Sequence, residues 1–199
     1  MNLESLAELT ASRVCHDLIS PIGALSNGLE LTRETGALGG EEMQLIEDCA
    51  EAASATLRFY RVAFGAASGG EALSANETTA IVAPFMKQKR IDLVWPVAPD
   101  GGSRSEVKLR LLLLLCVIDT LPRGGLVRNA PGGAFGWVAS AAKLLPQRLS
   151  DRIDAARNGR EPTAGDVHVT LMLREAEKRG LSCDVRHDEE SGELSVTLS

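Results

Sequence analysis

The sequence predicts an α+β fold in which a long N-terminal helical hairpin precedes an α/β sandwich domain. Two long segments near the N-terminus carry apolar residues at helical spacing, and a glycine-rich stretch separates them. Beyond residue 75 the pattern changes to shorter helical and strand-like segments. With 199 residues, 44% of them apolar and 24% charged, the chain can form a hairpin and one modest domain, and its composition excludes a disordered chain.

The first predicted helix runs from Leu3 to about Thr35, where the glycines of the GALGG segment end it. A second helical segment begins at Glu41 and Glu42, whose negative charges suit a helix N-terminus, and continues to Phe64. At 1.5 Å per residue, two helices of this length make a hairpin roughly 40 Å long.

A lone hairpin leaves apolar surface uncovered, because each helix covers only part of its partner's apolar stripe. Pairing with a second copy of the chain would bury the remainder and build a four-helix bundle. The sequence therefore predicts a homodimer. We divide the chain into a hairpin domain at 1–66, a linker of small residues at 67–75 and a second domain at 76–199.

The second domain is predicted to combine helices with a short mixed sheet. Its most apolar element is a helix from Val107 to Leu121, which Pro122 and the Gly124-Gly125 pair terminate. The other predicted elements are helices near 77–89, 147–158 and 167–179, and strands near 91–97, 125–128, 134–139, 181–187 and 193–198.

Charge and composition exclude several classes of function. A net charge of −6 and only seven aromatic residues (two Trp, one Tyr, four Phe) argue against nucleic-acid binding. The longest apolar run, Leu111–Ile118, has eight residues, whereas a membrane span needs about 20. Glu4 and Glu8 near the start do not fit a secretory signal, so we expect a cytoplasmic protein. The four cysteines contain no Cys-x-x-Cys pair, so no zinc or redox site is indicated.

The strongest candidate for a functional site is the segment CHDLISP at 15–21, inside the first predicted helix. At 100° per residue, His16 lies about 160° from the centre of the apolar stripe and faces away from the hairpin core. Pro21 removes one internal amide and should bend the helix one turn after His16. The same outer face carries small and polar residues that leave room for another protein, namely Ser12, Ser20, Gly23 and Asn27. From the residues alone, a solvated histidine beside a tolerated kink stays an open alternative.

The string HDLISP resembles the H-box of sensor histidine kinases, where an acidic residue follows the phospho-accepting histidine and proline stands five positions beyond it. The longer segments RVCHDLISPIGALSNGLEL and LRFYRVAFGAA are similar to the ChpT-type histidine phosphotransferases of alphaproteobacteria. Members of that family dimerise through a helical hairpin and carry a degenerate, GHKL-like kinase ATPase domain. The resemblance implies that His16 accepts the phosphoryl group and that Asp17 orients or polarises its ring.

The resemblance also places Ser20 where kinases have a residue tied to dephosphorylation, and we leave the role of Ser20 open. From helix geometry we expect Ser12, Arg13, Gly23 and Asn27 to contact the partner protein. The remaining histidines, His168 and His187, are interpreted as structural or merely exposed.

The second domain departs from the kinase pattern at the positions that bind ATP. In kinases the helix before a Pro-x-Gly-Gly turn reads roughly Asn-Leu-Leu-x-Asn-Ala, and its second Asn holds the magnesium of ATP. Counting back from Pro122, the two Asn positions fall on Leu112 and Cys116. Neither side chain can hold Mg²⁺, which needs oxygen ligands. We therefore expect that this chain binds no cofactor and that a partner receiver domain supplies the Mg²⁺.

The sequence thus predicts a histidine phosphotransferase that shuttles a phosphoryl group between receiver-domain aspartates in a two-component phosphorelay. The expected donor is the receiver domain of a hybrid histidine kinase, and the expected acceptors are response-regulator receiver domains. Two alternatives stay open. The first is a non-catalytic dimeric adaptor that docks receivers, and the second is an ATP-dependent histidine kinase.

Overall fold

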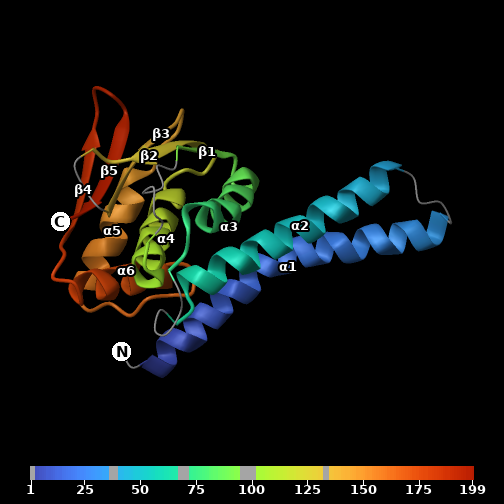
Figure 1. Cartoon of the computed structure of the whole chain (residues 1–199), viewed down its shortest axis with the longest axis horizontal. Coiled ribbons are helices and arrows are strands. Elements are labelled where there is room, and N and C mark those ends of the chain that lie inside the picture. The colour runs from blue at the N-terminus through green and yellow to red at the C-terminus, as the bar shows by residue number, and fades with distance from the viewer. Residues whose placement is uncertain (1–2, 36–39, 67–71, 95–101, 132–134) are drawn as a thin grey trace.

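The hairpin is the most extended part of the computed structural model, which describes residues 3–35, 40–66, 72–94, 102–131 and 135–199. Helices α1 (Leu3–Thr35) and α2 (Gly40–Ala63) pack against each other. Figure 1 shows one end of the hairpin projecting into solvent, while its base lies against the rest of the chain. Helix α1 is continuous through Pro21 and curves along its length.

The second part of the chain forms a five-stranded sheet covered by helices (Figure 1). The strand order is β1-β2-β3-β5-β4, with β1 and β2 parallel and the other neighbours antiparallel. The predicted α+β fold is therefore confirmed. The elements are α3 (Ala75–Gln88), β1 (Ile91–Val94), α4 (Arg104–Ile118), β2 (Gly125–Asn129), β3 (Phe135–Ser140), α5 (Pro146–Arg157), α6 (Val167–Glu177), β4 (Cys183–Asp188) and β5 (Glu193–Leu198).

Two helices begin earlier than predicted because each starts with a capping box. The side chain of Ser74 accepts a hydrogen bond from the Glu77 backbone N–H, and the Glu77 carboxylate accepts one from the Ser74 N–H. Ser103 and Glu106 make the same reciprocal pair at the start of α4. These bonds satisfy amides that would otherwise lack partners at a helix start. Helix α4 also ends at Ile118, before the predicted Leu121, and residues 95–97 of the predicted strand lie outside the described residues.

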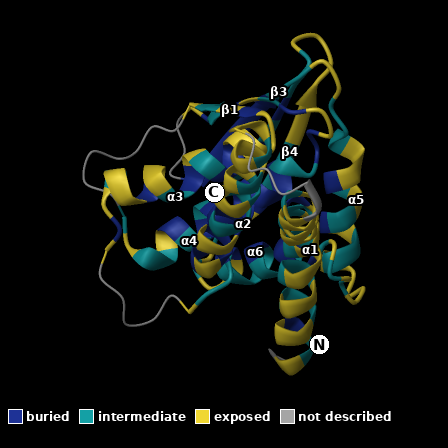
Figure 2. Ribbon diagram, turned by 90° about the vertical axis from the view of Figure 1, so that its right-hand side faces the viewer, coloured by how far each residue is buried: buried dark blue, intermediate teal, exposed yellow. Residues whose placement is uncertain are grey.

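Helix α4 lies in the centre of the core. Its side chains at 111–114 have no exposed surface, and Leu112 and Cys116 are among the fully buried residues. Figure 2 shows buried residues concentrated around α4 and the sheet. The core continues into the base of the hairpin, where Phe59 of α2 stacks on Phe85 of α3 with ring centroids 4.0 Å apart. The interpretation of α4 as a buried core helix is confirmed, and it leaves Leu112 and Cys116 no access to solvent.

The apolar stripe predicted on α1 divides into two halves. Val14, Leu18 and Leu25 are partly buried, whereas Ile22 and Leu29 are 51% and 46% exposed. The stripe is wider than a single neighbouring helix can cover, so the hairpin alone leaves part of it in solvent.

We predict that Gly124→Ala destabilises the protein by about 3 kcal/mol, because Gly124 has a φ of +81° and a Cβ there would lie 2.1 Å from the Arg90 carbonyl oxygen. Gly192→Ala is the matched control, since Gly192 also has a positive φ, +66°, but open space around it. The control should cost only about 1 kcal/mol. Urea unfolding of both variants measures the difference, and equal losses would contradict the proposed steric clash.

Candidate functional site

His16 stands on the exposed surface of α1 with its ring held by the next residue. The side chain is 82% exposed, and Nδ1 lies 2.9 Å from Oδ1 of Asp17. An ionised carboxylate can only accept hydrogen bonds, so this contact places a proton on Nδ1. The lone pair of Nε2 is then available to attack a group that arrives from solvent.

Asp17 is fixed from its other side as well. Its Oδ2 accepts hydrogen bonds from Nε of Arg13, at 2.8 Å, and from the hydroxyl of Tyr60 on α2. Burial raises the pKa of Asp17, but the hydrogen bonds from Tyr60 and His16 and the charge of Arg13 outweigh it and lower this pKa below its ordinary value. Asp17 therefore stays an anion that can accept from the His16 ring at neutral pH.

Arg13 connects this group to the sheet-containing part of the chain. Its Nη1 donates to the carbonyl oxygen of Gly165 at 2.8 Å, and its Nη2 lies 3.9 Å from Oδ1 of Asp119. Burial lowers the pKa of Arg13, but the nearby Tyr60, Asp17 and Asp119 raise it by more than burial lowers it. The net effect is a raised pKa, so the guanidinium stays charged. The segment of α1 around His16 is thus tied to the loop before α6 and to the end of α4.

Asp119, at the C-terminus of α4, gathers side chains from three other helices. It accepts a hydrogen bond from Arg152 of α5 and faces Arg13 of α1. Nε2 of His168, on α6, lies 3.4 Å from Oδ2 of Asp119 without the geometry of a hydrogen bond. His168 is 1% exposed, and burial lowers its pKa to about 4, so it is neutral at physiological pH. The interpretation of His168 as structural is supported.

The predicted docking residues separate into two groups. Ser12, Gly23 and Asn27 are exposed on the same helix as His16, as is Ser20, whose role stays open. Arg13 differs, because its side chain is only 16% exposed and is engaged with Asp17, Gly165 and Asp119. The structure thus gives Arg13 an internal role that its sequence position did not indicate, and a direct contact with a partner stays a prediction for Ser12, Arg13, Gly23 and Asn27.

Sequence reasoning missed Tyr60, Asp119 and Arg152. Tyr60 is the chain's only tyrosine and lies within the segment LRFYRVAFGAA, so a single phenol in an apolar segment was the available signal. The sequence signal for Asp119 was weaker, namely an acidic residue directly after a buried apolar helix. The pairing of these residues with α1 depends on tertiary packing, and local patterns do not show it.

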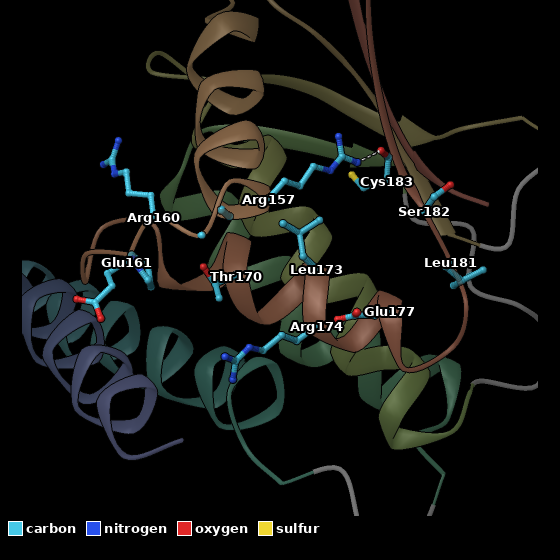
Figure 3. A pocket seen from close by; sticks show the side chains of 13 residues that line it. Arg157, Arg160, Glu161, Thr170, Leu173, Arg174, Glu177, Leu181, Ser182 and Cys183 are labelled. Atoms are coloured by element: carbon cyan, nitrogen blue, oxygen red, sulfur yellow. Dashed lines mark hydrogen bonds between the residues drawn. The ribbon is translucent and has the colours of Figure 1, made fainter. Parts of the chain in front are cut away.

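A cavity in the described part of the chain lies elsewhere. It has a volume of about 580 Å³ and is lined by residues of α5, α6, the start of β4 and the segments between them. Figure 3 shows Arg157 donating to the Cys183 carbonyl oxygen, while Arg160 and Arg174 point in different directions. The described lining includes no residue of α1 or α2 and no convergent set of cations. We therefore place the candidate site at His16.

Within the described ranges, no group of three or more His, Cys, Asp or Glu side chains is arranged to hold a metal ion. In the same ranges, no helix is long and apolar enough to span a bilayer.

An exposed, carboxylate-paired histidine on a helical hairpin, backed by an α/β domain, is the arrangement expected of a histidine phosphotransfer protein. Residues 75–191 match the family model described as "Histidine phosphotransferase C-terminal domain". The chain is 40% identical over 121 residues to the protein phosphotransferase ChpT of Brucella abortus (strain 2308), a match that covers 60% of this chain and 57% of that protein. A solved structure described as a bacterial phosphotransferase is similar over 100% of this chain and 98% of its own, with 28% identity and a TM-score of 0.81.

The chain belongs to the histidine phosphotransferase C-terminal domain family. Its resemblance to ChpT-type proteins, first seen in the two helical segments, is confirmed. The match to the Brucella protein spans little more than half of that relative's length.

Proposed function

We propose that this chain is a cytoplasmic, dimeric histidine phosphotransferase of a two-component phosphorelay. The observation that carries the proposal is the His16–Asp17 pair, which presents a free Nε2 on an exposed ring while the carboxylate holds Nδ1. The donor would be the receiver domain of a hybrid histidine kinase, and the acceptors would be response-regulator receivers. The hairpin at 1–66 would carry the phosphoryl group, and the domain at 76–199, after the linker at 67–75, would complete the receiver contact.

The proposed reaction begins with an aspartyl phosphate on a receiver. Nε2 of His16 attacks the phosphorus, a P–N bond forms, and the P–O bond to the receiver's aspartate breaks. The aspartate leaves with the electron pair as a carboxylate. The imidazole ring becomes cationic, and the Asp17 carboxylate at Nδ1 offsets this charge. The same steps in reverse load a second receiver.

Positioning and charge neutralisation account for most of the catalysis in such transfers. The chain's own residues therefore need to present Nε2 and to hold the Nδ1 proton, and both requirements are met at His16. Mg²⁺ would enter with the receiver, whose acidic pocket would hold it. A supply of Mg²⁺ by the receiver fits a second domain whose central helix has apolar side chains at the two positions where kinases have asparagines.

The homodimer is supported by the surface that the hairpin leaves exposed. On α1, Cys15, Ile22 and Leu29 are exposed at intervals of seven residues. On α2, Met43, Ala50 and Leu57 repeat the same interval and are exposed as well. Apolar residues at this spacing form one seam along a helix, as in helices that pack into bundles. We call these six residues the heptad seam, and a second copy of the chain is the occupant that would build a four-helix bundle on it.

A direct test of the function supplies a receiver domain from the same genome, phosphorylated with labelled acetyl phosphate. Label should move to the protein in a form that acid releases and alkali does not, as expected for a phosphoramidate. An acyl phosphate or a phosphoserine would differ from a phosphoramidate in its stability toward acid and alkali. Label that survives acid would contradict a phosphohistidine.

We predict that the chain takes no label from ATP. The positions that correspond to the two kinase asparagines are the buried Leu112 and Cys116, and neither offers an oxygen to Mg²⁺. Incubation with labelled ATP and Mg²⁺, without any receiver, should leave the protein unlabelled, and calorimetric titration with ATP should show no binding. Labelling under these conditions would make the chain a kinase.

A further inference from the structure

The surroundings of Asp17 imply a mechanism that sets the orientation of His16. Each carboxylate oxygen has its own task, because Oδ1 contacts His16 while Oδ2 accepts from Arg13 and Tyr60. Two donors on one oxygen oppose rotation of the carboxylate. The remaining oxygen is therefore kept in line with Nδ1 of the ring.

Tyr60 is itself held by the core of the molecule. It is 2% exposed, and its ring lies 5.8 Å from the ring of Phe85 on α3 and 4.9 Å from that of Phe64. A buried phenol needs a partner for its hydroxyl, and Asp17 provides one. Tyr60 thus fixes Asp17 relative to the second domain.

Asp119 performs the corresponding task for Arg13. Its ion pair with Arg152 holds the carboxylate at the end of α4, and the guanidinium of Arg13 lies between this carboxylate and that of Asp17. The side chain of Asp119 is 17% exposed and that of Asp17 is 15% exposed, so solvent screens these contacts less than it screens a surface pair.

We propose that Tyr60 and Asp119 are positioning residues for phosphoryl transfer, acting through Asp17 and Arg13 to keep the His16 ring in the form with Nδ1 protonated and Nε2 free. This inference rests on the proposed function and extends it, because it assigns control of the phosphoacceptor to side chains from α2 and α4. The second domain then orients the nucleophile as well as contacting the receiver.

The first test is Tyr60→Phe, which keeps the ring and removes the hydroxyl that reaches Asp17. The maximal rate of transfer from a phosphorylated receiver should fall about tenfold, the effect of losing one hydrogen bond to a charged group, while the KM for the receiver stays unchanged. Thr56→Val is the matched control. Thr56 is buried one turn earlier on α2 and donates to Gln88 at 3.2 Å instead of to Asp17, so its loss should leave the rate unchanged.

A second variant, Asp119→Asn, keeps the shape of the side chain and removes its charge. The maximal rate should fall about threefold to tenfold, because Arg13 loses one of the groups that orient it. Asp184→Asn is its control, since Asp184 also pairs with an arginine, Arg186, but on strand β4. This control should retain the wild-type rate.

Nitrogen-15 NMR of histidine-labelled protein gives a readout that a purely structural role would not change. The wild type and Thr56→Val should show His16 protonated mainly at Nδ1, and Tyr60→Phe should show a mixture of the two neutral forms. Equal rates and equal NMR populations in Tyr60→Phe and Thr56→Val would overturn the positioning proposal. Absence of transfer to the wild type would overturn the proposed function instead, and the NMR comparison would still decide the positioning role.

Discussion

His16→Gln should abolish acceptance of the phosphoryl group. Glutamine has no nucleophilic ring nitrogen, and the structure places His16 at the exposed end of the Asp17 pair, where a receiver can reach it. Because the side chain is 82% exposed, the free energy of unfolding should change by no more than about 0.5 kcal/mol. Label transferred from a phosphorylated receiver measures the activity, and urea unfolding measures the stability.

His187→Gln is the matched control for this prediction. His187 is another exposed histidine, located on β4 at a distance in sequence and fold from α1. The control should accept the phosphoryl group at the wild-type rate. A variant lacking His16 that is labelled as fast as the wild type would show that the phosphoacceptor lies elsewhere.

Leu29→Asp should convert the proposed homodimer to a monomer. Leu29 belongs to the heptad seam and is 46% exposed in the single chain. Burying a whole leucine contributes about 1.5–3 kcal/mol, so burying the exposed half of Leu29 contributes about 0.7–1.5 kcal/mol. A symmetric dimer loses two of these contributions, about 1.5–3 kcal/mol, which weakens association at least tenfold, and a carboxylate buried in each copy adds to the loss. Light scattering coupled to size-exclusion chromatography measures the mass directly.

Leu31→Asp is the control for Leu29→Asp, because Leu31 and Leu29 are almost equally exposed but lie on different sides of the helix. Leu31 is 49% exposed but lies two residues beyond Leu29, on another side of the helix. This variant should remain dimeric. If both variants dissociate, or neither does, the heptad seam is not the contact between copies.

The ends of the helices show how far local patterns predict this fold. Apolar spacing and glycine gave α1 and α2 to within a residue or two at their described ends. Apolar periodicity predicts that α4 starts at Val107, whereas the structure starts it at Arg104, after a capping box of Ser103 and Glu106 that the sequence itself displays. Periodicity alone predicts too late a start, because a helix begins where its first amides find acceptors.

The candidate site shows where prediction from sequence stops. His16 and Asp17 are neighbours in a motif, so a resemblance could find them. The donors that fix Asp17 come from α1 and α2, and Tyr60 is 43 residues away in sequence. Helix geometry predicts Arg13 on the docking face. Helix geometry alone cannot show that the Arg13 guanidinium turns toward Asp119 at the end of α4. Such assignments need the packing of the hairpin on the second domain.

The heptad seam could be predicted from the sequence only in part. The sequence indicated that one hairpin could not cover its own apolar stripe, and the structure identifies which residues stay uncovered. Ile22 and Leu29 were assigned to the same stripe as Leu18 and Leu25, and only the position of α2 separates them. Wide apolar stripes on a lone hairpin therefore predict association without giving the interface residues.

Tandem mass spectrometry with phosphorus-31 NMR can show whether His16 carries the phosphoryl group on Nε2. The protein is mixed with a receiver domain phosphorylated by acetyl phosphate and, separately, with ATP. We expect an Nε2-phosphohistidine at residue 16 from the receiver alone. Phosphoryl groups on another residue, transfer from ATP, or an unmodified protein that still binds the receiver would contradict it, the last result leaving a non-catalytic adaptor.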